Sequence, residues 1–545
     1  MTVRQTIAEA LERAAREIGV DGGLPDLELA RTRNAEHGDF ASSAGLKLAR
    51  VLRRRPDQIA ADLVAAIRLP GGEAEAEAAG GYVNFRLRAE WLQRLIAEVV
   101  GAGPRYGSSD LGGGERVQVE YLSTNPTGPL HIGHGRGAIL GDSLASLLAF
   151  TGHSTRREYY INDHGKQAHL FGASLLARLR DHDPPPNGYV GDYVNEIADR
   201  ARAAGLPETE EALMAFGLAL MVERFRALLE RLGVRYDDWF SEKSLWENGE
   251  AQRAIDRLRE KGLLKEKDGA TWFAPAMDED GDDAEDRVVF RSDGVHTYFA
   301  SDLGYLVNRF ETRGFQRVIE VWGADHHGYV PRMKQACAAL GIDSERLVII
   351  LNQLVTLKEG KMSKRAGRFV TLEELLDEVG ADAVRWFYLS RAPETMMEFD
   401  LELATTHNKT NPVYYVQYAH ARLAGIERTA AGRELPQEAD VALLDKPWEL
   451  GLARQLAHWP DTVAEATRLM EPHRLPYFIY ELADRVSTFY EAGNDNGEFR
   501  VVVDDPALTR ARLELARAAS ATLRSGLDLV GVSAPERMDR IPEEE

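Results

Sequence analysis

Two histidines, His131 and His134, stand three residues apart in the tract NPTGPLHIGHGRGAILGD, which is rich in glycine and proline. The glycines at positions 133, 135 and 137 predict a turn into a helix whose free amides and positive end attract a phosphate. Small residues also let a nucleotide approach the backbone, and the two imidazoles can donate hydrogen bonds to phosphate oxygens. The spacing therefore indicates a nucleotide-binding turn.

Two other kinds of site use similar residues. A metal pair is one alternative, but the chain lacks the His-Glu-x-x-His spacing and places no obvious third ligand near the histidines. A P-loop is the other, but GPLHIGHGRG does not end in Gly-Lys-Ser or Gly-Lys-Thr. Cys337 is the only cysteine, which excludes a zinc site built from two or more thiolates. No resident metal site is therefore expected.

A second cluster, KMSKRAG, follows the apolar run LVIILNQLV and a short turn. Lys361, Lys364 and Arg365 would form a cationic loop. Such a loop suits a pyrophosphate leaving group, because negative charge grows there in the transition state and nearby cations stabilise it. Taken alone, a basic loop of this length is more often a solvated turn.

The elements that must position these residues follow from the hydrophobic periodicity. RVQVEYLS alternates as a strand does, helical spacing runs from Ile139 to Leu148, and TRREYYIND is the next strand. A second β-α-β unit has strands near Val318 and Val348 and a helix ending near Leu340. The two units predict an α/β fold with a doubly wound, Rossmann-like parallel sheet, which binds nucleotides at the carboxyl ends of its strands.

Three domains are expected along the chain. Residues 1–110 predict an N-terminal α/β module, which ends in a linker rich in Gly, Ser and Pro. Residues 111–400 would carry the sheet, with a helix-rich insertion at about 170–290. Residues 401–545 predict an all-α helical bundle. Two helix starts are specific: Thr371 and Glu374 have capping-box spacing, and Asn411 precedes Pro412 as a cap precedes a first position.

The net charge of −21 argues at first against a polyanionic partner such as nucleic acid. Residues 1–110 hold 15 Lys and Arg against 16 Asp and Glu, so this part is far less acidic than the middle of the chain. The cluster Arg50, Arg53, Arg54 and Arg55 could contact phosphates, although a solvated helical face explains it equally well. No run approaches the roughly 18 apolar residues of a membrane span, and we expect a cytoplasmic protein without a membrane partner.

The motifs together resemble a known family. HIGH at a strand-to-helix turn and KMSK after a later strand resemble the two signatures of class I aminoacyl-tRNA synthetases. The segments YYINDHGKQ, WFSEKSLWENG, FRSDGVHTYFASDLGYL, VWGADHHGYVPRMK and NPVYYVQYAHAR are similar to those of the bacterial arginyl-tRNA synthetases, and the likeness extends over nearly the whole chain. It implies ATP-dependent ligation of L-arginine to its tRNA through an arginyl-adenylate, with Mg²⁺ accompanying ATP. We expect a monomer.

The resemblance also implies roles for individual residues. Its catalytic residues would be His131, His134, Lys361 and Lys364, and its ATP site would comprise Pro126, Gly128, His131, Gly133, His134, Lys361, Met362, Ser363 and Lys364. The arginine pocket would comprise Glu120, Asn125, Tyr298, Asp302, Asn162 and Gln167. Asp325, His326 and His327 would line the pocket without an assigned contact. Residues 1–110 would contact the tRNA, and its anticodon would meet the bundle at Tyr414, Tyr418 and Arg422.

Several of these residues have structural alternatives. Asp302 could be a helix N-cap, and the adjacent His326 and His327 could be structural. Tyrosines at helical spacing most often belong to the hydrophobic core. The acidic run MDEDGDDAEDR fails the EF-hand pattern and predicts a solvated loop. Two other functions remain open: a small-molecule nucleotidylyltransferase, which would not require the flanking domains, and a tRNA-binding relic, which would tolerate loss of the two signatures.

Overall fold

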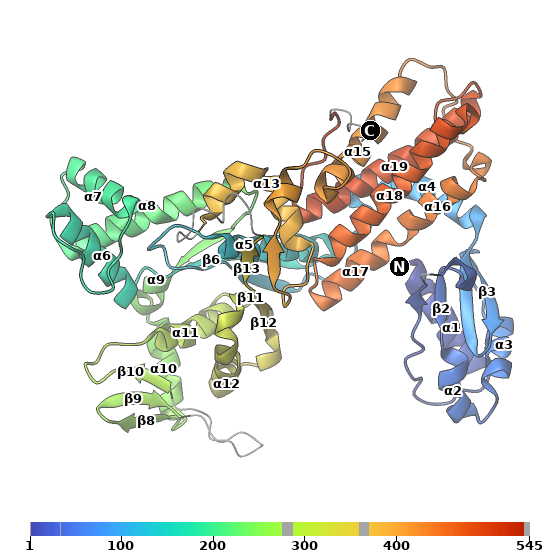
Figure 1. Ribbon diagram of the computed structural model, residues 1–545. Helices are drawn as coiled ribbons and strands as arrows, with labels where there is room; N and C mark the ends of the chain where they lie inside the picture. Colours follow the sequence, from blue (N-terminus) through green and yellow to red (C-terminus); the bar gives the residue numbers. More distant parts are fainter. Residues whose placement is uncertain (1, 33, 275–286, 359–369, 539–545) are drawn as a thin grey trace.

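The computed structural model describes residues 2–32, 34–274, 287–358 and 370–538. Figure 1 shows an elongated molecule, with helices α6–α8 at one end, the N-terminal module and the C-terminal bundle at the other, and the central sheet between them.

The N-terminal module is a four-stranded antiparallel sheet with helices packed against it. The strand order is β1 (Ala30–Arg31), β2 (Phe40–Ser42), β4 (Tyr82–Leu87) and β3 (Ala74–Ala79). Alternate residues of β4, namely Val83, Phe85 and Leu87, are buried, as expected for a strand with one face on the core. The helices are α1 (Val3–Glu17), α2 (Ala44–Leu52) and α3 (Pro56–Ala66); α4 (Ala89–Ala102) then packs against the bundle.

The central sheet has five parallel strands in the order β12-β11-β5-β6-β7. They are β5 (Arg116–Tyr121), β6 (Ser154–Ile161), β7 (Asp238–Ser241), β11 (Arg317–Gly323) and β12 (Leu347–Asn352). Helix α5 (Ile132–Phe150) connects β5 to β6, and α12 (Val330–Leu340) connects β11 to β12. The predicted doubly wound sheet is confirmed, and the strand order reverses between β5 and β11, where such sheets bind ligands.

One strand of the sheet was not expected. Strand β7 lies within residues 170–290, which we predicted as a helix-rich insertion, and pairs with β6 in the central sheet. Its four residues are all half-buried, so they show no alternation from which a strand could be recognised. The surrounding elements are α6 (Lys166–Leu179), α7 (Asp192–Ala203), α8 (Glu210–Arg231), α9 (Glu242–Glu247), α10 (Glu250–Glu260) and the antiparallel sheet β8 (Leu264–Lys267), β9 (Ala270–Phe273), β10 (Arg287–Phe290).

The described residues from 401 to 538 form helices and turns without a strand, as predicted. The helices are α14 (Leu401–Thr405), α15 (Pro412–Ala430), α16 (Pro447–Ala457), α17 (Trp459–Leu469), α18 (Arg474–Asp495) and α19 (Pro506–Val530). Before them come α11 (Tyr298–Val307), β13 (Val355–Leu357), α13 (Leu372–Leu389) and β14 (Met397–Phe399), with β13 and β14 paired in parallel. The cap at Asn411 and the capping box of Thr371 and Glu374 are both present.

A buried arginine joins the sheet domain to the bundle. Arg385 of α13 donates to Asp142 of α5 at 2.7 Å and to the Val530 carbonyl of α19 at 2.8 Å. Arg385 and Asp142 are each only 1% exposed. Gly531 ends α19 with φ of 69°, and a Cβ there would collide with the Arg385 guanidinium. Glycine at this position therefore permits both the helix end and the close approach of the arginine.

Candidate active site

The histidine turn connects β5 to α5 at the switch point of the sheet. His131 is the N-cap of α5, and its Nδ1 accepts a hydrogen bond from the Gly133 N–H at 3.1 Å. The Nδ1 of His134 accepts from the His131 N–H at 3.2 Å, and the two rings stack with centroids 3.5 Å apart. Because each Nδ1 is an acceptor, each neutral ring carries its proton on Nε2. Both residues therefore present an Nε2–H donor.

The rings stay uncharged near neutral pH. Burial lowers the pKa of His131, and burial together with the charge of His131 lowers the pKa of His134 to about 3. A neutral imidazole can still donate a hydrogen bond from Nε2 to a phosphate oxygen. Because it carries no charge, the departing phosphate does not have to break an ion pair with it.

The amides at the start of α5 are already engaged, which differs from the expectation of free donors. The Ile132 N–H donates to the Val370 carbonyl at 3.3 Å, Gly133 donates to His131, and the His134 N–H donates to the His131 carbonyl at 3.0 Å. The glycines have a packing role as well, because a Cβ on Gly135 would lie 2.6 Å from Leu372 of α13. The imidazole Nε2–H groups, rather than these amides, are the donors that this turn can offer, and that of His134 lies 3.4 Å from the Thr124 hydroxyl.

The preceding loop places Pro126 and Gly128 beside the histidines. Pro126 is buried and Gly128 is half-buried, and the hydroxyl of Tyr193 donates to the intervening Thr127 carbonyl at 2.8 Å. A Cβ on Gly128 would meet nothing closer than the Tyr193 hydroxyl at 3.6 Å. The start of α7 therefore supports this loop from outside.

The residues expected to hold the amino acid come from β5 and the loop after it, from the loop after β6 and the start of α6, and from α11. The side chain of Asn125 donates to that of Gln167, and Glu120 is buried near the end of β5. Asn162 is half-buried just after β6. A Cβ on Gly165, in the same loop, would lie 3.7 Å from the Tyr298 ring. The sheet topology therefore gathers these segments on the same edge of the sheet.

Asp302 lies one turn after Tyr298 within α11, whose N-cap is Thr297, so the capping alternative for Asp302 is wrong. It accepts a hydrogen bond from the Tyr329 hydroxyl. Burial raises the pKa of Asp302 to about 6, although the Tyr329 hydrogen bond opposes the shift. Tyr298 itself is 41% exposed.

Sequence reasoning missed Glu242, a buried carboxylate close to Asp302. It begins α9 directly after β7 and is 2% exposed. Its Oε2 has no hydrogen-bond partner among the described residues. Burial raises the pKa of Glu242 to about 8, and the charges of Asp302 and Asp163 add to the shift against a hydrogen bond from Ser301. Recognising β7 would have placed this residue at the carboxyl end of a sheet strand, where a site residue is expected.

The GADHHG tract follows β11, on the other side of the switch point. Asp325, His326 and His327 lie in the 3₁₀ turn Ala324–Tyr329, and all three are exposed. His326 Nε2 is 3.6 Å from Asp325 Oδ2, and His327 Nδ1 is 3.2 Å from the Ala324 carbonyl. Their exposure makes a role in the core untenable.

Lys361, Met362, Ser363, Lys364 and Arg365 lie outside the described residues, as does the acidic run at 277–286. The described chain resumes beside the histidine turn, because Val370 accepts from Ile132 and Thr371 forms an isolated bridge with His131. Val370 and Thr371 are therefore joined directly to the first turn of α5.

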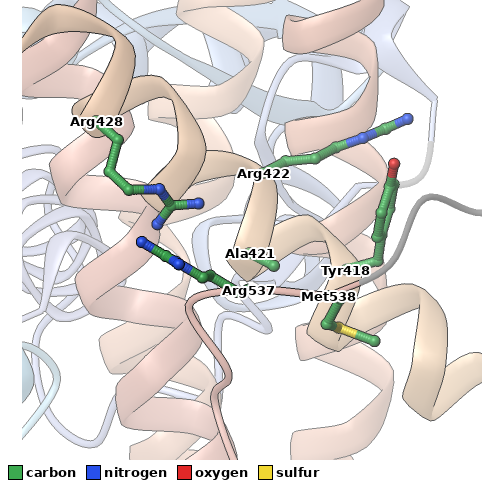
Figure 2. A pocket seen from close by; sticks show the side chains of 6 residues that line it. All are labelled: Tyr418, Ala421, Arg422, Arg428, Arg537 and Met538. Carbon is green, nitrogen blue, oxygen red and sulfur yellow. The ribbon is translucent and has the colours of Figure 1, made fainter.

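A separate cationic cavity lies between α15 and the C-terminal segment (Figure 2). It has a volume of about 530 Å³ and is lined by Tyr418, Ala421, Arg422, Arg428, Arg537 and Met538. The Arg422 guanidinium lies 4.5 Å from the centre of the Tyr418 ring, and Tyr414 stacks on Tyr418 with centroids 6.3 Å apart.

Residues at helical spacing on α15 differ in burial. Gln417 and Ala421 are buried, whereas Tyr414 and Tyr418 are half-buried at the surface. Gln417 donates to Asp382 of α13 at 2.8 Å, so its role is to hold α15 against the sheet domain. The core alternative fails for the two tyrosines, whose rings remain accessible.

Comparisons with known proteins agree with this arrangement. Residues 1–87 match the family described as Arginyl tRNA synthetase N terminal domain, residues 98–188 and 220–419 match tRNA synthetases class I (R), catalytic domain, and residues 416–538 match DALR anticodon binding domain. The chain is 46% identical to the arginine–tRNA ligase of Moorella thermoacetica, covering 98% of this chain and 97% of that one. It is 44% identical to the arginine–tRNA ligase of Syntrophotalea carbinolica, covering 98% and 99%.

Solved structures are similar over the same extent. The arginyl-tRNA synthetase of Thermus thermophilus superimposes with a TM-score of 0.80 at 26% identity, covering 98% of this chain and 100% of that one. That of Plasmodium falciparum, at 16% identity, shares the fold with a TM-score of 0.77, covering 99% and 100%. The sheet topology, the histidine turn at its switch point and the match along the full length show that the chain belongs to the class I arginyl-tRNA synthetase family.

Proposed function

We infer that this chain is an enzyme that ligates L-arginine to its tRNA in an ATP-dependent reaction, through an arginyl-adenylate. The main support for this inference is that the chain is 46% identical in sequence to an arginine–tRNA ligase over nearly the full length of both chains. The geometry supports it, because a donor pair for phosphate lies on the same edge of one sheet as a buried carboxylate, Glu242, and a half-buried one, Asp302.

In the first step the arginine carboxylate attacks the α-phosphorus of ATP in line, and pyrophosphate leaves. The Nε2–H groups of His131 and His134 donate to phosphate oxygens, and the loop of Pro126 and Gly128 with Gly133 forms the wall of the ATP site. The segment Lys361, Met362, Ser363 and Lys364 supplies cations to the pyrophosphate. Mg²⁺ would enter with ATP as part of the substrate and offset the triphosphate charge.

The guanidinium of arginine meets Glu242 and Asp302. A guanidinium presents parallel N–H donors, and carboxylates accept them in fork geometry. Each acid is disfavoured as an anion as long as no cation lies beside it, because burial raises the pKa of each. Tyr298 borders this end of the pocket, and Asn125, Asn162 and Gln167 line its polar wall. A neutral side chain would leave the carboxylates unpaired, which is the basis of specificity.

In the second step a ribose hydroxyl of the terminal adenosine attacks the arginyl carbonyl, so no protein nucleophile is required. Residues 111–400 carry both steps, residues 1–110 contact the tRNA, and residues 401–545 bind the anticodon. Tyr414, Tyr418 and Arg422 offer stacking faces and a cation to unpaired bases beside the cavity in Figure 2. No helix in the described part of the chain is long and apolar enough to cross a membrane. We propose a monomer that works in the cytoplasm, where tRNA is charged.

The test is exchange of labelled pyrophosphate into ATP, with each of the twenty amino acids, in the presence and absence of tRNA. We expect exchange with arginine alone. Exchange with another amino acid overturns the assignment of the pocket, and exchange with none, with or without tRNA, overturns the proposed enzyme.

A further inference from the structure

The segment that follows the last helix runs back along α15 and completes the cationic cavity. Helix α19 ends at Gly531, and residues 532–538, which we call the tail, come next. Val532, the first residue of the tail, is buried. Its last two residues, Arg537 and Met538, form one wall of the cavity, and α15 forms the other (Figure 2). The shape of the cavity therefore depends on how the tail is held.

The main anchor of the tail is Asp382, which belongs to α13 and not to the bundle. Its Oδ1 accepts from the Ser533 N–H at 2.9 Å, and its Oδ2 accepts from the Ser533 hydroxyl. Oδ2 also accepts from the side-chain amide of Gln417 at 2.8 Å, and that amide donates to the Ser533 carbonyl at 3.0 Å. One carboxylate thus joins α13, α15 and the tail.

Two residues of α15 hold the tail further along. The Nδ1 of His420 lies 2.9 Å from the Pro535 carbonyl, and Arg428 donates to the Glu536 carbonyl at 3.0 Å. Each of these residues makes one such contact, whereas Asp382 receives three hydrogen bonds as a charged acceptor, and charge-assisted hydrogen bonds are stronger than neutral ones. Removal of the Asp382 carboxylate should therefore displace the tail more than removal of either of the others.

The cavity that the tail completes has the chemistry of a phosphate site. Three of its six lining residues are arginines, and none of the six is acidic. The Arg422 guanidinium is held between the rings of Tyr418 and Tyr490, 4.5 and 4.6 Å from their centres, and Arg428 is engaged with the tail. Arg537 has no hydrogen bond or ion pair with any described residue. Its guanidinium is therefore the one best placed to bind an anion, and phosphate accepts its parallel N–H groups in fork geometry.

We propose that Asp382 is a positioning residue for tRNA: by fixing the tail, it holds Arg537 where the guanidinium binds a phosphate of the anticodon loop. This inference rests on the proposed function for the identity of the RNA. The loop is the part of the tRNA that fits, because stacking faces for unpaired bases, Tyr414 and Tyr418, border the same cavity. Asp382 itself does not touch the RNA, since its oxygens are occupied by the tail and α15.

The test is the affinity of the full chain for an arginine tRNA, measured by filter binding at several salt concentrations. Asp382→Ala removes three hydrogen bonds to the tail, and we expect it to raise Kd about tenfold through the loss of one charge-assisted contact with the RNA. Arg537→Ala changes an exposed side chain, so the fold is not at risk, and Kd should rise by a similar factor. Each variant should also flatten the slope of log K against log salt by about 0.7, the share of one phosphate contact. A purely structural defect would leave this slope unchanged.

Two comparisons show whether Asp382 acts through Arg537. The double variant should bind the tRNA no more weakly than Arg537→Ala alone, because both changes remove the same contact. For the same tRNA without its anticodon stem-loop, the wild type and both single variants should have equal affinities. The matched control is Asp377→Ala, also on α13, whose exposed carboxylate pairs with Arg231 and should leave Kd unchanged.

Steady-state charging gives an independent readout. Asp382→Ala should raise KM for tRNA about tenfold and keep kcat within twofold, because the defect lies in binding and is overcome by saturating tRNA. A partly unfolded variant would instead lose kcat at an unchanged KM. Asp382→Glu keeps the carboxylate and should recover part of the affinity.

The outcomes separate the two claims. Wild-type affinity for tRNA in Asp382→Ala or in Arg537→Ala overturns the inference and leaves the proposed function intact. A loss that persists without the anticodon stem-loop, or a double variant about ten times weaker than Arg537→Ala, also overturns it. Failure of the wild-type chain to bind the tRNA overturns the proposed function itself.

Discussion

Substitution of Glu242 by Gln should make the protein more stable and less active at once. The carboxyl group is 2% exposed, and burial raises its pKa to about 8 from an ordinary value of 4.5. At pH 7 the unfolded chain therefore carries a charge that the folded chain lacks, and this difference costs about 3 kcal/mol of folding free energy. Glutamine has nearly the same shape and no charge in either state, so the variant escapes this cost.

The sign of the effect depends on pH. A folded pKa above the unfolded value means that the native state binds more protons, so the stability of the wild-type chain falls as pH rises between about 4.5 and 8. The gain from Glu242→Gln should be absent near pH 4.5 and largest above pH 8. Thermal unfolding at pH 7 should show the transition of the catalytic domain roughly 5 °C higher in the variant.

Activity should change in the opposite direction. The variant loses one charge-assisted pairing with the arginine guanidinium, which is worth roughly 2–4 kcal/mol, so kcat/KM for arginine in tRNA charging should fall about 30- to 1000-fold. KM for ATP should stay close to the wild-type value. The control is Glu247→Gln at the end of α9, where the side chain is exposed and pairs with Lys243 at 3.0 Å. An unchanged transition temperature, or wild-type kcat/KM for arginine in Glu242→Gln, refutes the reasoning.

Three further predictions follow from the contacts. His134→Ala should abolish arginine-dependent pyrophosphate exchange while tRNA affinity, measured by filter binding, stays within twofold; normal exchange would refute the phosphate role. Replacing Tyr414 and Tyr418 together by Ala should weaken tRNA binding by roughly 1–3 kcal/mol for each stacked base lost, with no change in exchange-assay KM for arginine; unaltered tRNA affinity would count against stacking. Arg385→Met should lower stability by about 3–5 kcal/mol in denaturant unfolding, because it leaves the buried carboxylate of Asp142 without its partner at 2.7 Å; a loss below about 1 kcal/mol would show that Asp142 finds another partner.

Much of the fold could be predicted because its signals are local. The two β-α-β units appear as strand alternation followed by helical spacing, and the cap at Asn411 and the box at Thr371 and Glu374 depend on residues within one turn. The histidine turn could be placed for the same reason, since it separates a strand from a helix. Strand β7 was not predicted, because a half-buried strand of four residues has no local alternation of buried and exposed positions.

The residues of the arginine pocket could not be predicted from local spacing either. Glu120, Asn125, Tyr298 and Asp302 could be named only by resemblance, because no local spacing links them. Glu242 could not be identified from local spacing, because its place beside α11 depends on the pairing of β7 with β6 in the central sheet. The residues that determine its pKa come from different strands and helices, so no window of sequence contains the cause.

What the sequence determined by itself is the set of groups with the right chemistry and the local turns that expose them: the neighbouring histidines, the basic KMSK tract and the helix caps. What only the tertiary structure decided is their ionisation and their partners. Arg309 and Glu120 are 189 positions apart in the chain and 3.2 Å apart in space, and Glu120 lies beside Glu320 only after β5 and β11 pair. Burial and long-range pairing set these properties, because desolvation and Coulomb interaction depend on distance in space and not on position along the chain.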